Sequence, residues 1–120
     1  KVGAIIEISA PTDFNKWNDI LKAAKLPKSW LNGNTDSSFV GQLSPVNYVR
    51  KDCPPVFIAH GKDDSIIPYE QAEILYKSLK DKGVDCKFIV IEDGKHTLNA
   101  EQRYRVVSAM RKFIKKTLNL

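Results

Sequence analysis

The sequence predicts an α/β fold: a three-layer sandwich in which a parallel β-sheet is flanked by helices. Three apolar runs, over residues 2–9, 56–59 and 86–91, have the pattern of strands, and a helical pattern follows each of them. Strands that alternate with helices of this length form parallel sheets with right-handed crossovers. In such sheets, ligands and catalytic groups gather at the carboxyl ends of the strands. Functional residues are therefore expected in the loops that follow the strands.

The composition is that of one soluble globular domain or part of one. The 120 residues are 42% hydrophobic and 28% charged. No apolar run approaches the roughly 20 residues needed to span a bilayer. The first six residues have the pattern of a strand and not of a signal peptide. Because the chain starts inside a strand-like segment without an initiator methionine, we expect a processed product or a fragment, and the sequence indicates no compartment.

The net charge of +5 is concentrated at the C-terminus. Residues 99–120 hold six basic side chains and one acid, and the rest of the chain holds 13 of each sign. A basic surface can bind nucleic acid or an anionic membrane. No aromatic residues interleave with these charges as a stacking platform for bases would require. We therefore expect a solvated outer helix face and no nucleic-acid partner.

The first strand and helix are bounded by recognisable signals. Residues 2–9 are mostly apolar and β-branched, although Glu7 interrupts them, and Pro11 ends the strand. Asp13 can cap a helix that Pro27 stops. The apolar stripe of that helix has helical spacing and consists of Trp17, Ile20, Leu21 and Ala24.

The segment between the first two strands lacks a long period. Residues 27–45 predict an excursion over the sheet with short helices around 27–31 and 36–43, and residues 44–49 predict a turn that leads into the next strand. Loops of this kind often carry substrate contacts, and plain loop packing is an equally good interpretation.

The second half of the chain has a clearer pattern. Residues 56–59 predict a strand buried on both faces, and Pro68 opens a helix that Gly83 stops. A strand over 86–91 and a helix over about 99–117 follow. The inward residues are Ala72, Leu75, Tyr76 and Leu79 on the first helix and Val106, Val107, Met110, Phe113, Ile114 and Leu118 on the second. Cys53 and Cys86 are expected to be free thiols.

An acid and a histidine follow two successive predicted strands. Asp64 lies a few residues beyond the second strand, and His96 lies a few residues beyond the third. Neighbouring parallel strands are about 4.8 Å apart, so these side chains can meet. A carboxylate bonded to one imidazole nitrogen orients the ring as a general base. Alternatives are open on both sides, because Asp63 and Asp93 are further acids and His60 is a second histidine, although its place at the loop root favours a structural role.

The residues around this acid resemble a known family. The stretch 60–68, His-Gly-Lys-Asp-Asp-Ser-Ile-Ile-Pro, resembles the His-Gly-x-x-Asp-x-x-Val-Pro pattern of α/β-hydrolases of the esterase and lipase type, related to dienelactone hydrolases and prolyl-oligopeptidase-like peptidases. Gly94-Lys95-His96 resembles the Gly-x-His of the last strand-to-helix loop in that family. The resemblance implies that Asp64, and not Asp63, is the triad acid and that His96 is the triad histidine.

The resemblance extends over nearly the whole chain. Residues 11–14 resemble the segment that opens the lid region of the family, and residues 44–49 resemble the lead-in to the acid-bearing strand. Residues 1–120 are then a partial domain, the C-terminal half of an α/β-hydrolase fold, with a lid-like excursion over 14–44.

The nucleophile of that family is not recognisable. It lies in Gly-x-Ser-x-Gly, on a tight turn that precedes the acid and the histidine along the chain. The sequence contains no such motif, and Ser9, Ser44 and Ser65 lack its flanking glycines. The nucleophile and the oxyanion loop are therefore expected before Lys1.

The resemblance implies a serine hydrolase of small-molecule carboxylic esters without metal or cofactor. We expect the chain to need the missing N-terminal half for activity. Alternatives are a non-catalytic hydrolase-like binding module or a peptidase of the same fold. An exposed apolar first strand also predicts self-association of the isolated chain.

Overall fold

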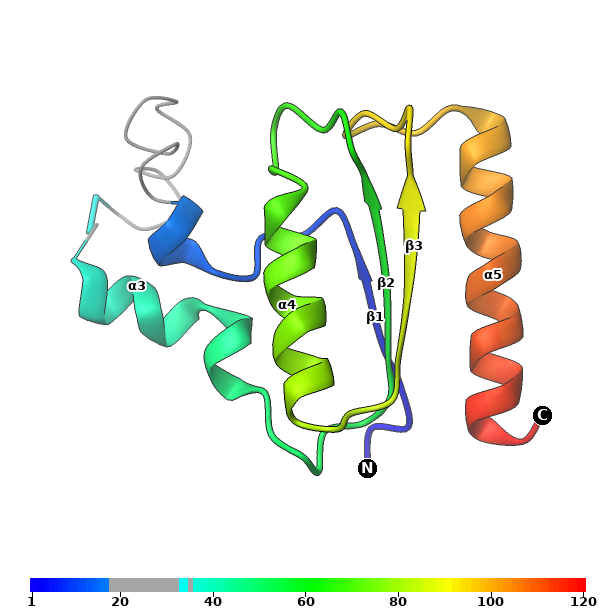
Figure 1. Ribbon diagram of the computed structural model, residues 1–120, viewed down its shortest axis with the longest axis horizontal. Helices are drawn as coiled ribbons and strands as arrows, with labels where there is room; N and C mark the ends of the chain where they lie inside the picture. The colour runs from blue at the N-terminus through cyan, green and yellow to red at the C-terminus, as the bar shows by residue number, and fades with distance from the viewer. Residues whose placement is uncertain (18–32, 35) are drawn as a thin grey trace.

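A three-stranded parallel sheet forms the centre of the molecule. The computed structural model describes residues 1–17, 33–34 and 36–120. The strands β1 (Ile5–Ile8), β2 (Val56–Gly61) and β3 (Cys86–Ile91) lie in chain order, so β2 is central. Helix α4 (Glu70–Asp81) covers one face of the sheet and helix α5 (Ala100–Leu118) covers the other (Figure 1). The predicted three-layer α/β architecture is confirmed.

The core is built by alternate side chains of β2. Val56 and Ile58 pack with residues of α4, and Phe57 and Ala59 pack with residues of α5. All six residues of β2 are buried. This explains the continuous apolar run, because a central parallel strand with a helix on each face has no solvent-facing side.

Strand β1 is shorter than predicted and is an edge of the sheet. Its pairing with β2 begins at Ile5 opposite Val56, so residues 2–4 have no partner strand and lie outside it. Ile5, Ile6 and Ile8 are 41%, 36% and 43% exposed. The acid between them, Glu7, is buried on the same face as its register partner Ile58. The pattern is therefore the reverse of an ordinary strand, with apolar side chains exposed and a carboxyl buried.

The segment after β1 is described in part. Asp13 caps its helical turn as predicted, because the Asp13 carboxylate accepts a hydrogen bond from the Lys16 N–H at 3.1 Å. Ile20, Leu21, Ala24, Pro27 and the helix predicted at 27–31 lie outside the described residues. The other predicted short helix is α3 (Ser37–Leu43), capped by Asp36. The turn predicted over residues 44–49 contains the 3₁₀-helix η1 (Pro45–Tyr48), with proline at the first helical position.

The two long helices begin and end close to the predicted residues. Helix α4 buries Ala72, Leu75 and Leu79, and Gly83 follows it in the left-handed conformation at φ 71°. Helix α5 begins with a capping box between Asn99 and Gln102. Its inward face is narrower than predicted, because Val107 and Leu118 are exposed. Both cysteines are free thiols, as expected.

Candidate active site

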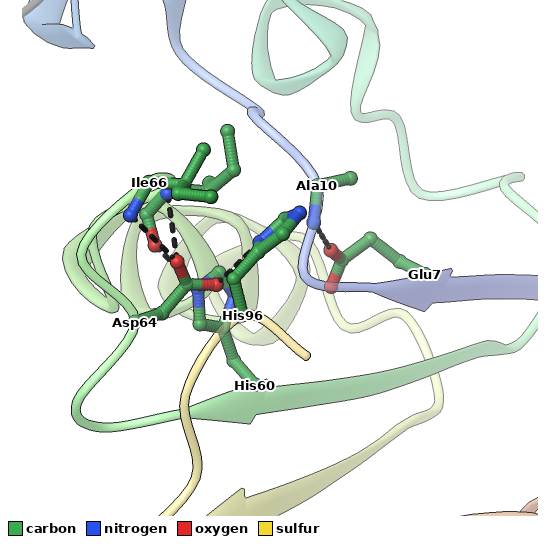
Figure 2. Close-up of polar contacts among 7 residues, drawn as sticks. Glu7, Ala10, His60, Asp64, Ile66 and His96 are labelled. Atoms are coloured by element: carbon green, nitrogen blue, oxygen red, sulfur yellow. Dashed lines mark hydrogen bonds and ion pairs between the residues drawn. The ribbon is translucent and has the colours of Figure 1, made fainter. Parts of the chain in front are cut away.

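Asp64 is the buried acid at the carboxyl end of β2. Its Oδ1 accepts hydrogen bonds from the backbone N–H groups of Ile66 and Ile67, each at 2.9 Å. The Asp64 side chain has no exposed surface. The loop therefore folds around its own aspartate, and these two donors fix the carboxylate so that Oδ2 points away from the loop backbone (Figure 2).

His96 meets this carboxylate from the loop after β3. The Nδ1 of His96 lies 2.9 Å from Asp64 Oδ2 (Figure 2). An ionised carboxylate only accepts hydrogen bonds, so Nδ1 carries the proton and the other ring nitrogen, Nε2, is the basic one. The His96 side chain is 37% exposed, whereas its aspartate partner is fully buried. This is the geometry of an oriented general base with a partly exposed ring.

His60 occupies the buried root of the same loop. Its Nε2 lies 2.8 Å from the Ile67 carbonyl oxygen and 3.4 Å from Asp64 Oδ2, and its side chain is fully buried. Because Nε2 faces two oxygen atoms, it donates its proton to them. His60 thus supports the loop from below, which fits the structural role favoured from the sequence.

Neither of the other candidate acids is paired with His96 among the described residues. Asp63 and Asp93 are exposed, and the nearest cation to Asp93 is Arg105 at 4.0 Å. The backbone N–H of Asp63 donates to the Gly94 carbonyl at 2.9 Å. The structure therefore brings together Asp64 and His96, the pair that the resemblance implied, and leaves the alternative acids outside.

Two glycines let the acid loop and the histidine loop touch. A Cβ atom added to Gly61 would lie 2.2 Å from the Gly94 carbonyl oxygen, far inside van der Waals contact. The Lys62 N–H donates to the Ile91 carbonyl at 2.9 Å beside this contact. Close backbone approach is thus the physical reason for glycine at both positions, and it sets the separation of the loops that carry Asp64 and His96.

No serine of the described chain makes a hydrogen bond with His96. Ser44 is buried, and its hydroxyl group bonds the Val40 carbonyl oxygen and the Phe14 N–H. Ser65 is exposed. Ser9 ends β1 in the left-handed conformation at φ 53°, but its Oγ is buried and has no partner among the described residues. None of the three is placed as a nucleophile for this histidine.

Glu7 is a polar group that the sequence interpretation missed. Burial raises its pKa from 4.5 to about 7, against the opposing effect of a hydrogen bond from the Ala10 N–H. Its Oε2 has no partner among the described residues. Glu7 lines a groove of about 540 Å³ at the outer edge of β1, beside Ile5, Tyr48, Val56, Leu75 and Leu79. The only signal in the sequence was an acid within an apolar strand.

Within residues 1–17, 33–34 and 36–120, no three His, Cys, Asp or Glu side chains are grouped so that they could hold a metal ion. No helix in this part of the chain is long and apolar enough to cross a bilayer.

The parallel sheet flanked by helices is the architecture of the α/β-hydrolases, and Asp64 and His96 follow successive strands as the sequence motifs led us to expect. The BD-FAE family model matches residues 1–79, and the chain belongs to that family.

Comparisons with individual proteins agree with this class. The chain is 30% identical over 79 residues to the probable carboxylic ester hydrolase LipM of Mycobacterium tuberculosis, a match covering 60% of the chain and 18% of LipM. A truncated carbohydrate esterase from gut microbiota superposes with a TM-score of 0.81 at 24% identity, over all of this chain and 44% of that one. A puromycin-hydrolysing peptidase of M. tuberculosis superposes with a TM-score of 0.84 at 20% identity, over 96% of this chain and 18% of that one. The chain thus spans less than half the length of these relatives.

Proposed function

We propose that this chain supplies the acid and the histidine of a serine hydrolase that acts on carboxylic esters. The observation that carries the proposal is the 2.9 Å contact between Asp64 Oδ2 and His96 Nδ1 at the carboxyl end of the sheet. Asp64 is the orienting acid, and His96 is the general base and then the general acid. The substrate is a small-molecule ester, and the mechanism uses no metal or cofactor.

Each half of the reaction has two proton transfers through one nitrogen. His96 Nε2 removes the proton from a serine hydroxyl as its oxygen attacks the ester carbonyl, and the imidazolium returns that proton to the leaving alcohol. A water molecule then attacks the acyl-enzyme in the same way and releases the carboxylic acid. Throughout, the Asp64 carboxylate stabilises the imidazolium without leaving its backbone donors.

The nucleophile and the oxyanion donors belong to polypeptide outside these 120 residues. Three observations support this part of the proposal: the sequence lacks Gly-x-Ser-x-Gly, the chain spans 18% of LipM and 44% of the carbohydrate esterase, and the apolar edge of β1 is exposed. Residues 1–120 are then a partial domain, with residues 14–44 as its lid-like excursion. A parallel strand of additional polypeptide on the edge of β1 would end, with its nucleophile, at the same carboxyl end of the sheet as His96.

The preference for an ester over an amide rests on the relatives. The match to LipM, named a probable carboxylic ester hydrolase, supports ester hydrolysis. The peptidase superposition shows the fold alone, and a peptidase would use the acid and the histidine in the same way. A non-catalytic module would have no need of a partly exposed histidine whose Nδ1 is bonded to a buried carboxylate.

The test compares hydrolysis of p-nitrophenyl acetate by the 120-residue chain and by a longer polypeptide that includes the upstream segment of the same gene. We expect the short chain to give no more turnover than free imidazole. In the active longer polypeptide, Asp64→Asn should lower kcat by about 10⁴-fold, because the wrong imidazole tautomer is favoured. Asp63→Asn is the matched control and should retain activity.

Two results would contradict the proposal. Turnover by the short chain well above imidazole, and lost in His96→Ala, would show that the nucleophile lies within the 120 residues. Full activity of Asp64→Asn in the longer polypeptide would show that Asp64 is not the triad acid.

A further inference from the structure

Trp17 and Ile67 form a small apolar cluster separate from the two faces of the sheet. Both side chains are 4% exposed, and Phe14 packs against them with its ring centroid 5.6 Å from that of Trp17. Ile67 belongs to the acid loop, whereas Trp17 belongs to the segment that follows β1. This cluster therefore joins the start of the excursion to the loop that carries Asp64.

Ile67 connects the Trp17 side chain to Asp64. Its N–H donates to Asp64 Oδ1 at 2.9 Å, and its carbonyl oxygen accepts from His60 Nε2 at 2.8 Å. His60 Nε2 in turn lies 3.4 Å from Asp64 Oδ2. A displacement of Ile67 therefore changes the position of the carboxylate both directly and through His60.

The segment that bears Trp17 is itself held firmly against α4. The backbone N–H groups of Thr12 and Asp13 both donate to Gln71 Oε1 at 2.8 Å, and the Thr12 hydroxyl group donates to the Gln71 carbonyl. Gln71 is 3% exposed, in the first turn of α4. The backbone N–H of Trp17 then donates to the Asp13 carbonyl at 3.1 Å. Trp17 is thus anchored to α4 through residues 12 and 13, and its side chain packs against Ile67 of the acid loop.

From these contacts we infer that Trp17 is a positioning residue for the Asp64–His96 pair. By holding Ile67, it keeps Asp64 Oδ2 directed at His96 Nδ1 and so selects the imidazole tautomer with the proton on Nδ1. The importance of Trp17 for catalysis rests on the proposed function. Its effect on the His96 tautomer does not, because it can be measured in the 120-residue chain. The helical turn that bears Trp17 is then connected, through Ile67 and Asp64, to His96.

The test is ¹⁵N NMR of the imidazole rings in the 120-residue chain, because nitrogen shifts of a neutral histidine distinguish the two tautomers. His60→Gln identifies which of the two rings is His96. In the wild-type chain we expect His96 to hold its proton on Nδ1. Trp17→Ala should lower the ratio of the Nδ1–H to the Nε2–H tautomer by about fivefold or more, since hydrogen bonds to charged groups contribute on this scale.

Two variants separate positioning from general stability. Trp17→Phe keeps an aromatic ring against Ile67 and should restore the wild-type tautomer ratio. Leu79→Ala removes a side chain that is 2% exposed and packs with Val56 and Ile58 on the α4 face, away from the acid loop. It should lower the thermal stability as much as Trp17→Ala does, and leave the tautomer ratio unchanged.

The inference fails if folded Trp17→Ala keeps the wild-type ratio, or if Leu79→Ala shifts the ratio equally. Should Trp17→Ala not fold, Trp17→Leu is measured instead against the same two outcomes. A longer polypeptide without esterase activity would overturn the proposed function and leave this result standing, so the two failures are distinguishable.

Discussion

The carboxyl ends of β2 and β3 differ from the outer edge of β1 in how fully their buried carboxyl group is hydrogen-bonded, although His60 Nδ1 in the first region is also buried without a partner in the described chain. Around Asp64, both carboxylate oxygens have donors, and the loops meet at a glycine contact. Along β1, three isoleucines are exposed, and Glu7 Oε2 and Ser9 Oγ are buried without partners in the described chain. Buried polar groups in native proteins are almost always hydrogen-bonded. The first region is thus preorganised by the chain itself, whereas the second has the character of a contact surface.

Gly61→Ala is expected to have the largest effect, because it acts on the preorganised region. The new methyl group would overlap the Gly94 carbonyl oxygen at 2.2 Å, and backbone on both sides prevents relief. We expect a loss of at least about 4 kcal/mol in the free energy of unfolding, measured by urea denaturation. Gly41→Ala is the control, since its closest contact is the end of the Asn15 side chain at 3.2 Å and it lies within α3. Equal stability of the two variants would contradict close packing of the loops.

Glu7→Gln tests whether Glu7 is a buried acid at the edge of β1, through the pH dependence of the free energy of unfolding. Burial raises the pKa of Glu7 from 4.5 in the unfolded chain to about 7 in the folded one. Below the lower value the carboxyl is protonated in both states. As the pH rises between the two values, only the unfolded chain loses the proton, so Glu7 lowers the stability progressively, by about 3 kcal/mol once the pH passes the folded value.

The measurement is urea denaturation of both proteins at about pH 4, 6 and 8. Glutamine keeps the acceptor for the Ala10 N–H and cannot ionise. The variant should therefore match the wild type at the lowest pH and exceed it by about 3 kcal/mol at the highest. A stability difference that does not change with pH would show that Glu7 is not a buried acid in solution.

Ile8→Lys is expected to change the free energy of unfolding least, by about 0.5 kcal/mol or less, because Ile8 is 43% exposed. Its effect should be on association, since lysine on an edge strand opposes pairing with another chain. Self-association of the wild-type chain, observed as a concentration-dependent sedimentation coefficient, should weaken in this variant. Val107→Lys, on the exposed face of α5, is the control and should behave as the wild type. A wild-type chain that stays monomeric at all concentrations would contradict the prediction.

The sequence was most informative where local pattern and tertiary environment agree. The run at 56–59 predicted a doubly buried strand because both of its faces meet helices, and Pro68 and Gly83 marked helix boundaries through backbone geometry. The motif resemblance selected Asp64 over Asp63, and the structure brings Asp64 to His96 at 2.9 Å. Spacing alone left both acids open, because adjacent residues in a loop have no fixed orientation.

What the sequence could not predict depends on contacts between distant segments. The start of β1 was placed three residues too early, since the register is set by where β2 begins. Glu7 interrupted an apolar run, but its burial follows from facing α4 beside Ile58. The contact between Gly61 and Gly94 and the bridge from Gln71 to residues 12 and 13 join parts of the chain that no periodicity relates.

The succession of β2, α4 and β3 has a consequence for the order of folding. Asp64 and His96 are separated by 32 residues, all within one crossover unit. The entropy of closing a loop of this size is modest, and short sequence separation favours early contact formation. The acid and the histidine can therefore meet as soon as this unit folds, before more distant segments are in place. Under the proposed function, an Asp64–His96 pair assembled this early would be a fixed template on which a nucleophile from outside these 120 residues is aligned.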